Sequence, residues 1–119
     1  MDDLKLFDAE FRLADIVWER EPVNSTELVG LCAEKLGWKK STTYTMLRKL
    51  CERGVLQNEN AVVTARVTRE QVRRYQSEAL LEKAFDGSLP VFVASFLRDK
   101  KLTSEEALKL QCMIEEAAK

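Results

Sequence analysis

Apolar residues recur at helical spacing through most of this chain, and in its first half they mark three short helices. The first is expected to run from Asp8, whose carboxylate would cap it, to near Arg20. The second opens at Asn24 and stops at Gly37. Only a few residues separate it from a third helix that ends before Gly54, and so short a connection predicts the steep crossing of a helix-turn-helix.

The third helix divides into an apolar face and a face of hydroxyls and cations. Thr43, Leu47, Leu50 and Cys51 recur at the spacing that faces a core. Outward hydroxyl and cationic groups suit contacts with DNA phosphates and base edges. The predicted DNA-binding residues are Lys39, Lys40, Ser41, Thr42, Tyr44, Thr45, Arg48 and Lys49.

The hydrophobic period changes after Gly54. Residues 55–57 and 61–67 are rich in β-branched side chains and flank the polar turn Asn58-Glu59-Asn60, a pattern typical of a two-stranded hairpin. Three helices followed by a hairpin is the order of a winged helix, whose third helix enters the DNA major groove. We therefore expect residues 1–67 to form a winged-helix DNA-binding domain.

Residues 68–119 carry three further helical patterns. Thr68 and Gln71 form a capping box for the first, and Gly87 ends it. Pro90 suits the first turn of a short helix, and Thr103 opens the last one. The predicted fold class is mostly α with a small β-hairpin (α+β), a winged helix-turn-helix domain followed by a helical dimerisation domain.

The helical region is too small to enclose a core alone, since the smallest domains bury only about 60% of their unfolded surface. A second copy of the chain is the simplest partner, because two-fold dimers are the commonest assembly and match palindromic DNA sites. The alternative is that these helices pack back onto the winged helix of the same chain. The predicted dimerisation residues are Val72, Tyr75, Ala79, Phe92, Phe96, Leu110, Met113 and Ile114.

Charge supports DNA binding only locally. The formal net charge of the 119 residues is -1, yet residues 39–54 carry five basic and one acidic side chain. A local basic patch can supply phosphate contacts even on a protein without net positive charge. A solvated helix face would show the same run of charge, and that alternative stays open.

Candidate catalytic chemistry is scarce. Histidine is absent, which removes the commonest general base and metal ligand. Cys32, Cys51 and Cys112 form no Cys-x-x-Cys pair and fall on apolar helix stripes, so we expect three buried thiols, no metal, no cofactor and no enzyme.

The sequence also predicts a cytoplasmic protein without a membrane partner. The start Met1-Asp2-Asp3 is acidic where a signal peptide is basic. No apolar run reaches the length of about 18 residues that a membrane helix needs.

Three linked segments resemble the penicillinase repressor family of bacterial winged-helix regulators, the BlaI/MecI type of the wider BlaI/MecI/CopY superfamily. The first helix, with Asp8-Ala9-Glu10-Phe11-Arg12 and Val17-Trp18-Glu19, is similar to the family's opening segment. Trp38, Thr42-Thr43-Tyr44-Thr45, Leu47, Lys49-Leu50 and Glu52-Arg53-Gly54 resemble its recognition-helix signature. Phe85-Asp86-Gly87-Ser88, the region of Phe96 and the closing helix resemble its dimerisation domain.

The resemblance implies a homodimeric transcriptional repressor that binds a palindromic double-stranded DNA operator, of β-lactamase or related genes. It also implies release after a sensor-linked metalloprotease cuts the dimerisation domain, and the corresponding bond is Ser95–Phe96.

This chain departs from the family pattern at several positions. Family members known to be cut carry Asn before the Phe of that bond, where this chain has Ser95. The family usually has Ser, Val and Arg where Lys39, Thr43 and Lys49 stand, and many of its wings carry basic residues that the hairpin tip here lacks. The single Cys112 differs from the four-cysteine cluster of the copper-responsive branch.

A second function class fits the same elements. A winged-helix protein–protein interaction module, without sequence-specific DNA binding, would agree with the net charge of -1 and the neutral wing. Salt separates the two, because DNA affinity falls steeply as salt rises and an apolar protein interface changes little.

Overall fold

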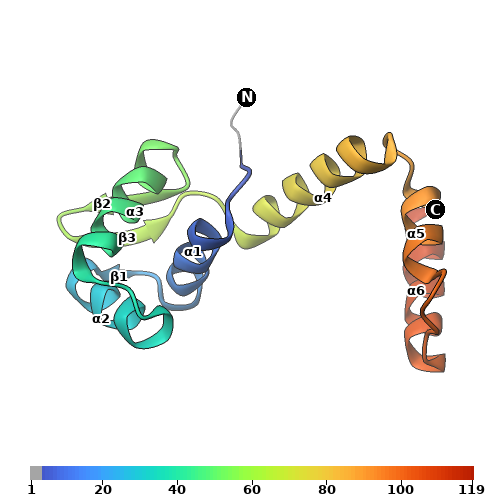
Figure 1. The fold of residues 1–119 in the computed structure, drawn as a ribbon, viewed down its shortest axis with the longest axis horizontal. Helices are drawn as coiled ribbons and strands as arrows, with labels where there is room; N and C mark the ends of the chain where they lie inside the picture. The colour runs from blue at the N-terminus through green and yellow to red at the C-terminus, as the bar shows by residue number, and fades with distance from the viewer. Residues whose placement is uncertain (1–3) are drawn as a thin grey trace. The chain divides into compact units, whose positions relative to one another are not determined.

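Residues 4–119 are described by the computed structural model, and they form six helices and three short strands (Figure 1). The mostly helical α+β fold class is thereby confirmed. The acidic Met1-Asp2-Asp3 segment lies outside the described residues. In chain order the elements are α1 (Asp8–Arg20), β1 (Val23–Asn24), α2 (Ser25–Leu36), α3 (Lys40–Glu52), β2 (Leu56–Glu59), β3 (Val62–Ala65), α4 (Arg69–Phe85), α5 (Leu89–Leu97) and α6 (Ser104–Ala117).

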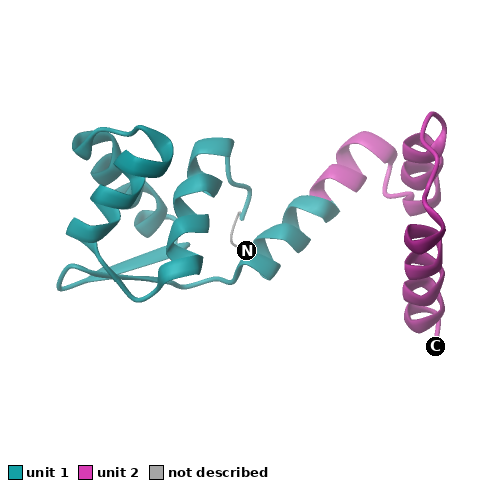
Figure 2. Cartoon of the chain, turned by 90° about the horizontal axis from the view of Figure 1, so that it is seen from below, with its two compact units in different colours: residues 1–78 teal, residues 79–119 magenta. Residues whose placement is uncertain are grey.

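The chain divides into unit 1, residues 1–78, and unit 2, residues 79–119 (Figure 2). In unit 1, α1, α2 and α3 pack against one another, and the small sheet packs against α1 and α3. The predicted apolar stripes of the three helices meet in this core. Its buried members are Leu6, Leu13, Ala14, Ile16, Val17, Val23, Leu28, Leu31, Cys32, Leu47, Leu50, Val55, Leu56, Val63 and Val72.

Local signals set most of the helix ends. The Asn24 side chain accepts a hydrogen bond from the Thr26 amide at 2.9 Å, which confirms it as the cap of α2. Gly37 ends that helix with φ 70°, a left-handed conformation that favours glycine. The cap predicted for α1 is wrong: Asp8 is already helical, and the Glu10 carboxylate accepts the Phe7 amide instead.

The wing is part of a three-stranded antiparallel sheet with the order β1-β3-β2. The sequence does not predict β1, because two residues are too few to show a period. Val23 of β1 pairs with Val63, and Glu59 of β2 pairs with Val62. The hairpin turn is therefore Asn60-Ala61, which shares only Asn60 with the predicted Asn58-Glu59-Asn60 turn.

The first turns of α4 belong to unit 1. Trp18 Nε1 donates to the carbonyl of Val67 at 3.0 Å, and the Arg69 guanidinium lies 5.4 Å from the Trp18 ring centroid. Arg69 also pairs with Asp15 and, at 3.2 Å, with Glu19. These hydrogen bonds, above all the one to Asp15, raise the pKa of the Arg69 guanidinium.

Val72 completes the attachment of α4, since its side chain is fully buried in the unit 1 core. Gln76 Nε2 donates to the Leu6 carbonyl at 3.3 Å. The two compact units accordingly meet within α4, at residues 78 and 79, whereas the sequence predicts a boundary at residues 67 and 68.

Unit 2 has capped helices but no enclosed core. Ser88 and Thr103 accept backbone hydrogen bonds at the starts of α5 and α6, as the capping pattern predicts for Thr103. Phe85 and Phe92 make an edge contact with ring centroids 5.2 Å apart. No residue from 79 to 119 is buried in the single chain.

The three cysteines differ in burial. Cys32 is buried and Cys51 is half-buried, and burial raises the pKa of both thiols, so they are protonated near neutral pH. Cys112 is exposed on α6, so the prediction of a third buried thiol is wrong for the single chain. It fails because unit 2 encloses no core of its own in which Cys112 could be buried.

The Asn60-Ala61 turn generates a stability prediction. Both residues have positive φ, 54° and 66°, as a two-residue type I′ turn requires. This conformation strains alanine but not glycine, so Ala61→Gly should raise the free energy of unfolding by about 0.5–1 kcal/mol in urea denaturation.

Ala33→Gly supplies the control, because Ala33 is an exposed residue inside α2. Glycine there should lower the free energy of unfolding by about 1 kcal/mol. Equal destabilisation by both substitutions would contradict the strained turn.

Candidate nucleic-acid interface

The two faces of α3 are as different in the structure as in the sequence. Thr43, Leu47 and Leu50 are buried against the unit 1 core. Tyr44 is half-buried and packs at the edge of that core. The other predicted DNA-binding residues are all exposed, namely Lys39, Lys40, Ser41, Thr42, Thr45, Arg48 and Lys49.

Burial of Thr43 costs little because its hydroxyl is satisfied inside the helix. Thr43 Oγ1 donates to the carbonyl of Lys39 at 3.2 Å. A buried hydroxyl without such a partner would be destabilising. The inward face of α3 therefore tolerates one polar residue, and the helix keeps the rotation that turns its hydroxyls and cations outward.

The cations on the outward face keep their charge available. Among the ion pairs formed within residues 4–119, none involves Lys39, Lys40, Arg48 or Lys49. The first turn of α3 has no acidic residue, and its free amides carry the positive end of the helix dipole. Both features favour a phosphate at this end of the helix.

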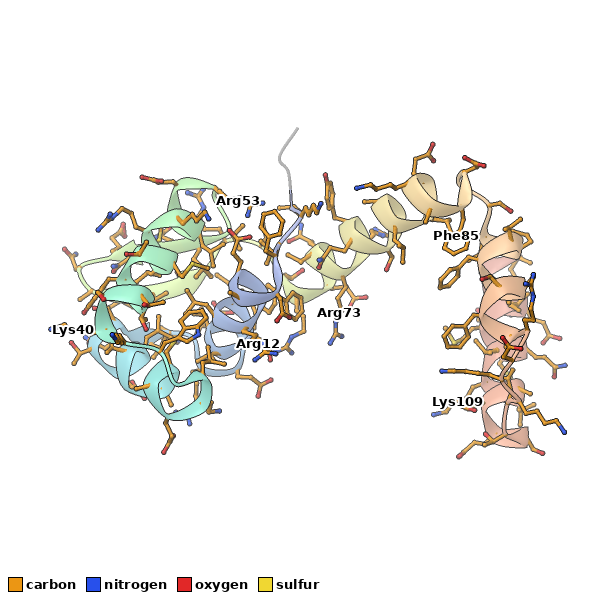
Figure 3. All side chains as sticks on the ribbon, viewed as in Figure 1. Arg12, Lys40, Arg53, Arg73, Phe85 and Lys109 are labelled. Carbon is orange, nitrogen blue, oxygen red and sulfur yellow. The ribbon has the colours of Figure 1, made fainter. Side chains whose placement is uncertain are left out.

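Arg53 does not contribute to this surface, although the sequence counts it with the basic run. Its guanidinium turns back onto Glu10 of α1, with Nη1 3.0 Å from both carboxylate oxygens. Figure 3 shows Arg53 and Lys40 at opposite ends of α3. The outward charge of α3 therefore comes from the four cations that precede Arg53.

The hairpin tip adds no cation to the interface. Asn58, Glu59 and Asn60 are exposed, and the sequence from residue 55 to residue 65 contains no lysine or arginine. Val62 is also exposed beside the tip. Contacts of this wing with a nucleic acid would have to use amide and backbone groups.

The predicted dimerisation residues are placed unevenly. Val72 is removed from that set, because its side chain is occupied by the core of its own chain. Tyr75 and Phe92 are half-buried, and the others are exposed, namely Ala79, Phe96, Leu110, Met113 and Ile114. Phe85, which is not among the eight predicted dimerisation residues, contacts Phe92. Phe96 also contacts Phe92, within α5.

No helix among the described residues combines the length and apolar character needed to cross a membrane. Residues 4–119 also hold no group of three His, Cys, Asp or Glu side chains that could bind a metal ion.

Comparisons with known proteins agree with this architecture. The chain is 25% identical over 116 residues to the penicillinase repressor of Bacillus licheniformis, covering 94% of this chain and 91% of that one. It is 26% identical over 110 residues to an uncharacterised 16.5 kDa protein of Latilactobacillus sakei, covering 89% of this chain and 75% of that one.

A solved structure shares the fold. The solution structure of monomeric Bacillus licheniformis BlaI, determined in complex with the blaP half-operator, aligns with a TM-score of 0.50 and 24% sequence identity. The alignment covers 59% of this chain and 92% of that one. The likeness supports the winged-helix assignment of the fold.

The family described as Penicillinase repressor matches residues 6–116, nearly the whole chain. Its members are transcriptional repressors rather than enzymes, which confirms the prediction of a non-enzymatic protein. The chain belongs to the penicillinase repressor family.

Proposed function

We propose that this chain is a DNA-binding transcriptional repressor that works as a homodimer on a palindromic operator. The observation that carries the proposal is the outward face of α3, where hydroxyls stand beside four cations with no carboxylate partner among the described residues. The relative in the BlaI half-operator complex, which has the same fold, supports DNA as the partner. A repressor of this kind blocks transcription by occupying its operator and does not catalyse a reaction.

The residues of α3 divide between two tasks. Thr42, Tyr44, Thr45 and Arg48 are proposed to contact base edges in the major groove, where hydroxyls and a guanidinium can distinguish bases. Lys39, Lys40, Ser41 and Lys49 are proposed to contact phosphates, which fix the position of the helix and supply most of the salt-dependent affinity.

Unit 2 supports a dimer because its apolar side chains have no cover in the single chain. Helix α5 carries no charged residue, and its Leu89, Val91 and Phe96 are more than half exposed. On α6, Met113 and Ile114 are each 65% exposed. A helix that is apolar all round is stable in water only when it is covered, and a second copy supplies a matching surface.

Release from DNA is proposed to follow proteolysis of the Ser95–Phe96 bond. The Ser95–Phe96 bond lies inside α5, among the apolar side chains proposed to meet the second copy. A sensor-linked metalloprotease that cut there would separate α6 from the rest of the chain. β-Lactamase or related genes are the proposed targets, because the chain belongs to the penicillinase repressor family.

A protein–protein interaction module is the second candidate, favoured by a wing tip without basic residues and by the formal net charge of -1. The salt dependence of binding separates it from the first. Affinity for DNA should fall steeply between 50 and 200 mM salt, roughly tenfold or more for each pair of phosphate contacts.

Substitutions on α3 test the division of tasks. The probe is the duplex that the wild-type protein enriches from a randomised DNA library. Arg48→Ala should cost about 1–3 kcal/mol on this duplex and relax its base preference. Lys40→Ala should weaken selected and unselected DNA alike and lower the salt slope by about one.

Lys101→Ala is the matched control, since Lys101 is an exposed lysine outside the winged helix, and it should bind DNA like the wild type. Gel-shift titrations measure all three variants. Wild-type affinity for both Arg48→Ala and Lys40→Ala would show that α3 is not the DNA-binding helix.

The apolar stripe of α6 tests the dimer. Ile114→Asp places a charge on the stripe and should shift the full chain from dimer to monomer, because burying an unpaired carboxylate is costly. Gln111→Asp adds the same charge beside the stripe and should leave a dimer. Sedimentation velocity distinguishes the two, and a dimer that survives Ile114→Asp would place the interface elsewhere.

Two fragments test the release mechanism. Residues 1–95 should bind the selected duplex more weakly than the full chain, because removal of α6 takes away apolar burial worth about 1.5–3 kcal/mol per large side chain and favours monomers. Adding the fragment 96–119 should not restore full affinity at low concentration. If residues 1–95 bind as tightly as the full chain, cleavage of this bond is not the switch.

A further inference from the structure

Two segments that the proposed DNA-binding surface does not use meet inside unit 1. One is the start of α1 at Glu10, and the other is Arg53, the residue that follows α3. The Glu10 side chain is only 2% exposed and that of Arg53 is 25% exposed. Arg53 Nη1 donates to both oxygens of the Glu10 carboxylate at 3.0 Å, so this is a largely buried, charge-assisted contact.

Each partner is also fixed by the backbone. Glu10 Oε1 accepts the Phe7 amide at 2.9 Å, and Arg53 Nη2 donates to the carbonyl of Lys5. The Arg53 amide donates to the Lys49 carbonyl at 3.1 Å, in the last turn of α3. The pair therefore joins the C-terminal end of α3 to the start of α1 and to the segment before it.

This contact fixes the position of α3 along its own axis, which packing of the apolar core alone does not. Leu47 and Leu50 hold α3 against the core, but apolar attraction is not directional and tolerates small shifts along the helix. Hydrogen bonds to both carboxylate oxygens depend on distance and angle, and they weaken steeply when either partner moves. A buried ion pair often adds little net stability over apolar residues of the same size, so its main effect here is geometric.

We infer that Glu10 and Arg53 are positioning residues for DNA recognition, which hold α3 at the place where its outward side chains reach base edges. The inference rests on the proposed function. Contacts with base edges need side chains placed within about 0.5 Å. Lysine contacts with phosphates tolerate larger shifts, because the ammonium group is a point charge on a flexible stem.

Loss of the pair should therefore lower specificity more than nonspecific affinity. The measured quantity is the ratio of two dissociation constants, one for unselected duplex DNA and one for the duplex that the wild type enriches from a randomised library. Glu10→Gln should lower this ratio by about tenfold, as expected from one weakened base contact. Binding to unselected DNA and its salt slope should stay near the wild-type values, because the residues proposed to contact phosphates are unchanged.

Arg53→Lys is the second variant, in case Glu10→Gln does not fold. It keeps the charge but cannot donate to both carboxylate oxygens in the same fixed geometry, and it should also lower the ratio. Val72→Ala is the stability control, because it truncates a core residue that belongs to α4 and takes no part in the pair of Glu10 and Arg53. Glu27→Gln is the ion-pair control, since it breaks the exposed pair of Arg20 and Glu27.

The outcomes are distinct. The inference is overturned if the wild-type protein selects a sequence and the folded Glu10→Gln and Arg53→Lys variants keep the wild-type ratio to within about twofold. A twofold difference is about the scatter expected between independent sites. It is also overturned if Val72→Ala lowers the ratio of dissociation constants as much as Arg53→Lys does when the two variants have the same free energy of unfolding. A wild-type protein that enriches no sequence overturns the proposed function itself, and the inference with it.

Discussion

Burial of the apolar face of α3 is the interaction on which the rest of the proposed site depends. Leu47 and Leu50 pack into the unit 1 core, and Thr43 joins them because its hydroxyl is satisfied by the Lys39 carbonyl. A helix with one apolar stripe has one favourable rotation against a core. That rotation turns the hydroxyls and cations outward, so the same free energy that folds unit 1 also presents its candidate DNA-binding surface.

The two units differ in how they bury apolar surface. Unit 1 encloses a core that includes Val72 of α4. The compact winged-helix unit therefore extends beyond α1, α2, α3 and the strands into the first part of α4. Unit 2 leaves Phe96, Met113 and Ile114 more than half exposed in the single chain. The proposed dimer would cover these side chains and would make the stability of unit 2 depend on protein concentration.

The pattern of ion pairs, and not the net charge, decides which cations of the chain remain without a carboxylate partner among the described residues. Carboxylates of α1 pair with Arg12, Arg53 and Arg69, so the charge of each of these arginines is balanced by a neighbouring carboxylate. No carboxylate of residues 4–119 is paired in this way with the lysines of α3. A chain with a formal net charge of -1 can therefore present a locally cationic face to a polyanion.

The sequence by itself determined the order of the helices, the caps at Asn24 and Thr103, and the two faces of α3, because residues a few positions apart carry these signals. Only the tertiary structure decided the two-residue strand at Val23, the core position of Val72 and the pairing of Glu10 with Arg53. Each of these joins residues that are distant in the sequence. Local periodicity reports which face of a helix is apolar, but the side chains that meet are fixed by the path of the whole chain and the burial it achieves.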